Sequence, residues 1–385
     1  MDERRARLAW RHRLLPADRT DKVAAVADGL VALHSSDPVT VYLSAMVRMT
    51  NPSVGAVERA LYEDRSLVRH HAMRRTLWVA TPETTRRMHA AATRKIAAVE
   101  HRRTVKMLHE SGLDDGDAWL SAAKRDVLSV LHDEGPMTAR QLGRKIPALT
   151  HPMVIGVGKP YEATVSAHTR VLLVLGFEGS LVRTRPTGTW INGQYTWAAM
   201  DSWLPGGVDG LDERGAAGDL AGHWLRRFGP GTSTDLQWWM GWTAALTRRA
   251  LQDCEAVPVD LAGSTGWVAA ADDAPVEPAG PWTALLPGLD PTTMGWKERG
   301  WYLPIEAADV FDRNGNAGPT IWADGRVVGA WAQRPDGEIR LHWFLDVAPR
   351  RRAEVEQRAD ELRQWLGGTR FSVRFPGRVH ATLLA

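Results

Sequence analysis

A histidine, two serines and an aspartate lie together in the segment Leu33–Pro38, whose sequence is Leu-His-Ser-Ser-Asp-Pro. Asp is a favoured N-cap residue and Pro is favoured at the first helical position, so a helix is expected to begin at Asp37-Pro38. His34 and Ser36 would point about 200° apart in a continuous helix. At a junction between two helices, however, they can converge on one point. There, a histidine and a hydroxyl could hold a water molecule or stabilise a developing charge.

A purely structural interpretation of the same segment stays open. His34 could close one helix while Ser36 assists the cap of the next, and the residues alone favour this interpretation over chemistry. Other catalytic signatures are missing, since the chain contains no phosphate-binding loop, no His-Glu-x-x-His zinc helix and no Gly-x-Ser-x-Gly elbow. The single cysteine, Cys254, excludes a disulfide framework and a cysteine-based zinc site. We therefore expect neither a metal nor a cofactor.

The elements around this segment are expected to form three helices followed by a hairpin. Val23, Val26, Leu30 and Leu33 recur at helical spacing and indicate the first helix. The second helix begins at Asp37-Pro38, and the third is a short one near residues 57–61. Strand-like runs at 66–71 and 76–80 then supply the hairpin. This is the order of elements in a winged helix.

The same order of elements returns twice, and such repeats are diagnostic of a fold. In the second copy, a helix ends at Gly135-Pro136 and the capping box Thr138-x-x-Gln141 starts another. A helix at 168–175 and strands at 181–184 and 195–198 follow. The third copy has a helix ending at Phe228 and the similar turn Gly229–Thr232. Helices near 236 and 246 and strands at 256–260 and 267–270 complete it.

After Pro281 the pattern changes to short strands separated by turns. Asp324-Gly325 and Asp336-Gly337 are hairpin signals, a charged helix is expected at 350–365, and a last strand at 371–375. These strands could form a small β-barrel or an open sheet. We predict an α+β protein with three tandem winged-helix domains followed by a small C-terminal β-barrel. The predicted domains are residues 1–110, 111–205, 206–279 and 280–385.

The distribution of charge favours a polyanion as partner. The chain has a net charge of +3 and a pI of about 9.1, and basic residues are concentrated between Arg65 and Lys106. The first residues, Met1–Arg5, lead into alternating charge without an apolar run, which argues against a signal peptide. The longest apolar run is also too short to cross a bilayer. We expect a cytoplasmic, nucleoid-associated protein that binds duplex DNA and has no membrane partner. Most of the 18 tryptophans are expected to be core anchors.

Several motifs resemble the AlkZ/YcaQ-like winged-helix DNA glycosylases, a family of crosslink-unhooking and alkylpurine glycosylases. The resemblance rests on an ordered set of segments that covers nearly the whole chain: Leu33–Pro38, Arg75-Thr76-Leu77-Trp78, Leu285–Asp290, Gly295–Arg299, Pro319-Thr320, Asp324-Gly325-Arg326 and Val328-Gly329. Each motif is modest by itself, and the ordered set is specific.

The resemblance implies a function and a site. In that family the catalytic motif is Gln-x-Gln or Gln-x-Asp, which positions the water that cleaves the N-glycosidic bond of N7-alkylated or crosslinked guanine. The corresponding positions are His34 and Ser36, so the motif departs from the pattern. The implied function is a monofunctional DNA glycosylase for alkylated or crosslinked purines in duplex DNA. The alternative is a catalytically inactive winged-helix protein that binds DNA or senses lesions.

Candidate DNA contacts are the arginines of the two hairpins and two basic residues of the late motif. They are Arg69, Arg74, Arg75, Arg183, Arg185, Lys297 and Arg299. Each could instead be a solvated surface charge. Phosphate contacts position a protein without specifying sequence, so we expect recognition by shape and lesion. Because three repeats lie in one chain, a monomer is expected to wrap one site. An open cleft suits a bulky adduct better than a closed pocket for a flipped base.

Overall fold

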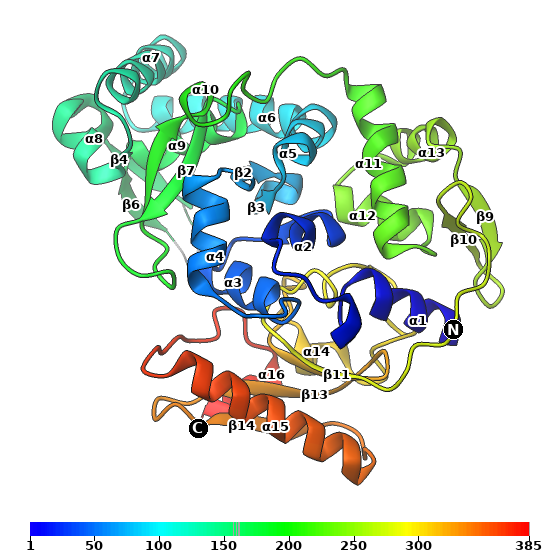
Figure 1. Ribbon diagram of the computed structural model, residues 1–385. Helices are drawn as coiled ribbons and strands as arrows, with labels where there is room; N and C mark the ends of the chain where they lie inside the picture. The colour runs from blue at the N-terminus through cyan, green and yellow to red at the C-terminus, as the bar shows by residue number, and fades with distance from the viewer. Residues whose placement is uncertain (157, 159, 161, 385) are drawn as a thin grey trace. The chain divides into compact units, whose positions relative to one another are not determined.

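The structure is a computed structural model that describes residues 1–156, 158, 160 and 162–384. The chain forms two compact units. The split unit consists of residues 1–58 and of residues from 217 onward, and the inserted unit consists of residues 59–216. Helices and strands occur in both units, as the α+β prediction requires (Figure 1). Within the described ranges, no helix combines the length and the apolarity needed to cross a membrane.

The first elements of the split unit are α1 (Asp2–Arg11), α2 (Val23–Gly29), β1 (Leu33–His34), α3 (Pro38–Met46) and α4 (Val54–Glu58). The predicted first helix therefore ends before Leu33. Its end is explained by Val31, whose φ of 61° is left-handed and stops the helix. The predicted start of α3 is confirmed, because the Asp37 carboxylate accepts a hydrogen bond from the Val39 N–H at 3.3 Å.

The inserted unit opens with a short π-helical segment, which is followed by a hairpin and further helical segments. The elements are a π-turn (Arg59–Glu63), β2 (Val68–Ala72), β3 (Thr76–Ala80), α5 (Pro82–Met88), a second π-turn (His89–Thr93) and α6 (Arg94–Glu110). Strands β2 and β3 pair antiparallel, with Val68 opposite Ala80, as the hairpin prediction requires. Helices α5 and α6 were not predicted.

The rest of the inserted unit repeats the helix and hairpin order. Its elements are α7 (Gly116–Glu134), β4 (Met137–Thr138), α8 (Ala139–Lys145), β5 (Pro152–Ile155), β6 (Ala163–Ser166), α9 (His168–Phe177), β7 (Leu181–Pro186), β8 (Tyr195–Ala199) and α10 (Met200–Trp203). The capping box of Thr138 and Gln141 is present at the start of α8. Strands β4, β8 and β7 form one sheet in that order, and the hairpin β5–β6 is an additional, unpredicted element.

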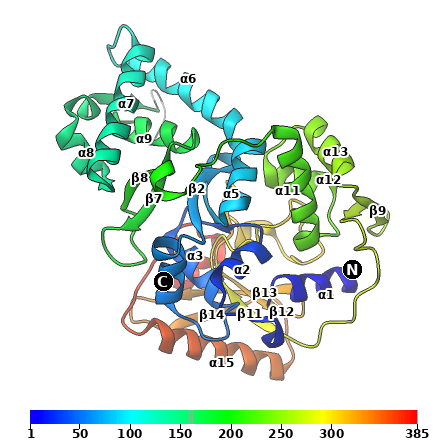
Figure 2. The same ribbon diagram turned by 45° about the horizontal axis from the view of Figure 1, so that its top comes forward.

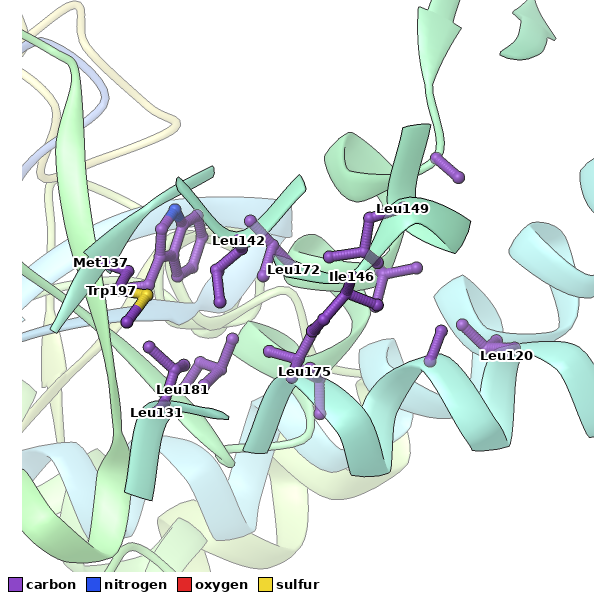
Figure 3. Close-up of a cluster of buried hydrophobic side chains, with 14 of the residues drawn as sticks. Leu120, Leu131, Met137, Leu142, Ile146, Leu149, Leu172, Leu175, Leu181 and Trp197 are labelled. Atoms are coloured by element: carbon purple, nitrogen blue, oxygen red, sulfur yellow. The ribbon is translucent and has the colours of Figure 1, made fainter. Parts of the chain in front are cut away.

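One apolar core holds these helices against the sheet (Figure 3). Side chains from α7, α8 and α9 meet side chains from β7 and β8, among them Leu131, Leu142, Leu175, Leu181 and Trp197. All of these residues are at most 8% exposed. Burial of one such leucine contributes about 2 kcal/mol. The helical spacing in the sequence therefore marks the packed faces correctly. Figure 2 shows α8 and α9 beside the strands that they cover.

The split unit resumes within α11 (Glu213–Phe228), at residue 217. It continues with α12 (Ser233–Met240), α13 (Ala244–Asp253), β9 (Val257–Asp260) and β10 (Thr265–Val268). Strands β9 and β10 pair antiparallel, and an isolated bridge joins Gly231 to Trp267. A capping box between Thr232 and Asp235 starts α12. The third predicted set of helices and strands is therefore present.

The C-terminal strands form an open sheet, so the predicted barrel is wrong. Strands β11 (Thr283–Leu286), β12 (Thr320–Ala323), β13 (Arg326–Gln333) and β14 (Ile339–Trp343) pair antiparallel in that order. Among the described residues, β11 and β14 are the two edges and do not pair with each other. The helices that accompany the sheet are α14 (Ala307–Val310), α15 (Pro349–Leu366) and α16 (Arg378–Leu384).

The predicted last strand, residues 371–375, is irregular chain in the structure. A side chain takes the place of strand pairing there, because the Gln333 amide accepts from the Phe371 N–H at 3.1 Å and donates to the Thr369 carbonyl at 3.0 Å. Side chains of a strand alternate between its faces. Ala330 and Ala332 of β13 pack against α16, and Trp331 points to the other face.

A buried ion pair joins the two sequence parts of the split unit. Arg48 follows α3 and Asp290 ends the Leu285–Asp290 motif, and both side chains are 0% exposed. The Arg48 guanidinium donates to both Asp290 carboxylate oxygens, at 2.8 and 2.9 Å. Its remaining N–H groups donate to the His12 carbonyl, the Ser44 carbonyl and the Thr292 hydroxyl. All five donors of the guanidinium are satisfied.

Three buried histidines lie in the inserted unit. His70 Nε2 lies 3.4 Å from His89 Nδ1, and His71 stacks on Trp197. Burial holds the pKa of His70 and of His71 well below the ordinary value, with further lowering from His89 and Arg183 respectively. Burial also lowers the pKa of His89 to about 4, against the opposing charge of Asp209. All three rings are therefore neutral in the folded protein at pH 7.

Removal of one partner of the buried ion pair should unfold the protein more easily. The substitution Arg48→Met leaves the Asp290 carboxylate buried without a counter-charge, so the free energy of unfolding is expected to fall by about 3–5 kcal/mol. Urea unfolding followed by circular dichroism measures it. The control is Arg363→Met, which removes an exposed pair with Asp360 and should change stability by less than about 0.5 kcal/mol. Equal effects of the two substitutions would contradict the assignment.

The buried histidines should make the inserted unit less stable in mild acid. As the pH falls below about 6.5, these histidines bind protons in the unfolded chain but stay neutral in the folded chain. The free energy of unfolding is therefore highest above that pH and decreases toward pH 4. At pH 5, His89 alone should account for a loss of about 2 kcal/mol. The variant His89→Gln cannot titrate and should therefore lose less stability between pH 7.5 and pH 5 than the parent in thermal unfolding. The exposed His109→Gln control should behave like the parent.

Candidate active site

The segment that contains His34 and Ser36 links β1 to α3. His34 and Ser35 are buried, at 2% and 1% exposure, whereas Ser36 and Asp37 are partly exposed. The backbone N–H of Ser36 donates to His34 Nδ1 at 3.3 Å. Because Nδ1 accepts this bond, a neutral His34 has its proton on Nε2. The two candidate residues are thus held together by a hydrogen bond from the Ser36 backbone to the His34 ring.

Arg374 also contacts this segment. Its Nη1 donates to the Ser36 carbonyl at 2.9 Å. Burial raises the pKa of Asp37 from its ordinary value, and the charge of Arg374 and the Val39 N–H act in the opposite direction. Arg374 is exposed, so it adds a cation beside Ser36. Sequence reasoning missed it, since 338 positions separate the two residues and no motif relates them.

The helix that follows the segment is fixed by the late motif of the chain. Every residue of α3 is buried. The Thr40 hydroxyl donates to the Gly288 carbonyl at 2.6 Å, and the Ser44 hydroxyl donates to Asp290 at 2.7 Å. Residues 285–290 therefore hold α3 in place, and α3 in turn positions Ser36. This gives a physical reason for two distant motifs to occur together.

Two of the predicted DNA contacts in the inserted unit, Arg69 and Arg183, pack against aromatic rings. Arg69 is 2% exposed, donates to the Tyr62 hydroxyl at 2.9 Å and lies 4.5 Å from the Tyr195 ring. The guanidinium of Arg183 lies 4.8 Å from the Trp197 ring, and burial lowers its pKa to about 10. Arg69 is therefore buried, with its guanidinium packed against aromatic rings, and its contact with DNA stays a prediction. Arg183 is partly exposed and lines a groove, described below.

The other hairpin arginines are nearer to solvent. Arg74 and Arg75 form the turn between β2 and β3, with left-handed φ angles of 56° and 59°. Arg75 is 55% exposed and pairs with buried Glu100 at 2.8 Å. Arg185 is 47% exposed, stacks over Tyr62 and lies 3.4 Å from Glu63. Arg75 and Arg185 are thus exposed but already paired with acids.

Lys297 and Arg299 belong to the split unit and differ in exposure. The backbone N–H groups of Lys297 and Glu298 both donate to Asp235 at 2.9 Å, and Asp235 is fully buried. This contact leaves the Lys297 side chain exposed. Arg299 is half-buried, with its guanidinium 3.9 Å from the Phe311 ring. Lys297 is therefore the better placed of the two for a phosphate contact.

A basic groove with a volume of about 720 Å³ lies in the inserted unit. Its cationic side chains are Arg140 and Arg144 of α8 and Arg183 of β7. His168 at the start of α9 also lines the groove, and burial lowers the pKa of its ring. No acidic residue lines it within the described part of the chain. Arg140 and Arg144 are exposed, and neither forms an ion pair with a described residue. Arg140 and Arg144 were not predicted as DNA contacts, because the prediction for this part of the chain considered the arginines of the hairpin and not those of the helix after the capping box.

A comparison with protein families decides the class of the protein. The family model described as DNA glycosylase AlkZ-like matches residues 27–365, which is most of the chain. The chain belongs to the AlkZ-like DNA glycosylase family. The match includes the segment with His34 and Ser36 and all the hairpin arginines, so membership of this family implies that the chain binds DNA.

A solved structure supports the fold of this AlkZ-like chain. The structure of Streptomyces sahachiroi DNA glycosylase AlkZ is similar, with a TM-score of 0.71 and 22% identity. The alignment covers 96% of this chain and 98% of that one. At this identity the likeness concerns the fold. Among curated proteins, none matches the sequence.

The basic groove leads to a prediction for DNA binding. The double variant Arg140→Ala/Arg144→Ala should bind duplex DNA about 10-fold more weakly than the parent because two phosphate contacts are lost. The slope of log K against log salt concentration should decrease in magnitude by about 2. Fluorescence anisotropy with a labelled duplex measures both. Lys145→Ala is the matched control, since Lys145 lies on the same helix but pairs with Glu134 at 2.8 Å. An unchanged salt slope in the double variant would contradict this role.

Proposed function

We propose that the chain is a monofunctional DNA glycosylase that hydrolyses the N-glycosidic bond of alkylated or crosslinked purines in duplex DNA. Membership of the AlkZ-like DNA glycosylase family is the observation that carries the proposal. The proposed architecture is three winged helices, within residues 1–110, 111–205 and 206–279, followed by an open-sheet domain. The strand order β4-β8-β7 and the bridge between Gly231 and Trp267 support the second and third of these units.

The chemistry required of such a site is mild. An N7-alkylated purine already carries positive charge, so it departs without a strong general acid. The protein needs to place a water molecule and to stabilise an oxocarbenium-like sugar. Residues that form hydrogen bonds are sufficient for this purpose. A histidine and a serine can both form hydrogen bonds of this kind.

The roles of the two residues follow from their geometry. Ser36 is the partly exposed member of the pair, so its hydroxyl is the group expected to hold the water. His34 fixes the Ser36 backbone through Nδ1. We therefore assign His34 the role of positioning Ser36 beside the water. Arg374, beside the Ser36 carbonyl, adds a positive charge that favours a nearby phosphate.

The proposed roles can be tested on a duplex that contains N7-methylguanine. Single-turnover base release is measured by alkaline cleavage of the abasic sites. His34→Ala should slow release about 10²-fold or more while DNA binding is retained. His34→Gln should keep more activity than His34→Ala because its amide oxygen can still accept the Ser36 N–H. His109→Ala, an exposed histidine, is the matched control and should leave the rate unchanged.

The alternative function makes a different prediction in the same assay. A catalytically inactive lesion-binding protein would show salt-dependent duplex binding that His34→Ala leaves intact, with no base release by the parent protein. The absence of release on several alkylated and crosslinked substrates would therefore replace the glycosylase proposal. Release by the parent that His34→Ala and Ser36→Ala do not slow would keep the activity and reject the assigned site.

A further inference from the structure

A pocket with a volume of about 360 Å³ lies in the split unit, outside the site described above. It is bounded by the C-terminal end of α3, strand β11 and the C-terminal half of α15, which are labelled in Figure 1. Its apolar lining includes Leu43, Met46, Leu285, Trp331, Leu362 and Trp365. Pockets for small molecules have volumes of about 300–1,000 Å³ and are mostly apolar with a few polar groups. The pocket therefore has the size and lining of a ligand site.

Two arginines line the pocket. Arg19 lies before α2, and Arg358 belongs to α15. Neither forms an ion pair with any residue in the described ranges. Arg358 donates through Nε to the Thr283 hydroxyl at 2.9 Å. The Nε of Arg19 is buried and, within the same ranges, has no hydrogen-bond partner. Two guanidinium groups thus lie at one apolar pocket with hydrogen-bonding capacity unused.

The charges around the pocket favour an anion. Burial lowers the pKa of Arg19, and the like charge of Arg358 lowers it further, while Glu361 acts in the opposite direction. Glu361 is exposed and accepts a hydrogen bond from Gln357 at 3.0 Å. It is the one acidic residue among the described pocket residues, against two cations. A carboxylate placed between the two guanidinium groups would remove their repulsion and satisfy their free donors.

We propose that this pocket binds a small monocarboxylate with an apolar body. The carboxylate would lie between Arg19 and Arg358, and the body would pack against Trp331, Leu285 and Leu362. An aromatic acid with two fused rings fits the volume. Leu43 and Met46 of α3 also line the pocket, so an occupied pocket would stabilise the helix that begins beside Ser36.

The proposal is tested by isothermal titration calorimetry, in which the full-length protein is titrated with 1-naphthylacetate. A Kd of about 100 μM is expected for a ligand of this size. The neutral analogue 1-naphthylacetamide has the same body without the charge and should bind at least about 10-fold more weakly. Arg19→Gln and Arg358→Gln should each weaken binding of the acid to a similar extent. Arg350→Gln is the matched control, because Arg350 lies on the same helix and is 84% exposed.

A variant that fills the pocket separates the possible outcomes. Leu362→Trp should abolish binding of both the acid and the amide, with the same circular dichroism spectrum as the parent. The proposal is overturned if the acid shows no saturable binding below about 1 mM. It is also overturned if the acid and the amide bind equally and the arginine variants have no effect. Loss of duplex DNA binding in Leu362→Trp would instead assign the pocket to a nucleic-acid surface. None of these outcomes depends on glycosylase activity.

Discussion

The split unit depends on one buried ion pair. Arg48 and Asp290 are separated by 242 positions, yet both are fully buried and joined by two hydrogen bonds. A buried charge is costly unless its hydrogen-bonding groups are all satisfied, and here every guanidinium donor has a partner. Asp290 in turn accepts from Ser44 and from the Thr292 N–H. The position of α3, and with it the loop of His34 and Ser36, is a consequence of this pair.

Much of the fold could be predicted from local signals, because helix caps and hairpin turns depend on interactions between residues that are close in sequence. The Asp37-Pro38 cap, the Thr138 capping box and the β2–β3 hairpin depend on residues close in sequence, and all are present. The prediction of a β-barrel was wrong because a barrel closes only if its two edge strands pair, and these strands are far apart in the chain. The prediction of a last strand at 371–375 was wrong because the side chain of Gln333, 36 or more positions away, forms hydrogen bonds with the backbone there.

The candidate site was predicted less well than the fold. The pairing of His34 with Ser36 could be inferred because the two residues are neighbours in sequence. Arg69 looked like any hairpin arginine, and its burial between Tyr62 and Tyr195 depends on the tertiary packing of three separate segments. Arg374 could not be related to Ser36 by any spacing rule. The distribution of charge in a sequence indicates the sign of the charge on its partner, and tertiary packing determines which charged side chains can contact that partner.

The turn between β2 and β3 has a cost that the rest of the hairpin does not explain. Arg74 and Arg75 both adopt left-handed φ angles, which glycine adopts freely and which cost another residue on the order of 1 kcal/mol. Asn-Gly or Gly-Gly would form such a turn more easily. The strained tip instead places the Arg74 guanidinium 5.9 Å from the Trp78 ring and lets exposed Arg75 pair with buried Glu100. The contacts of these two side chains are thus formed at the expense of the stability of the turn itself.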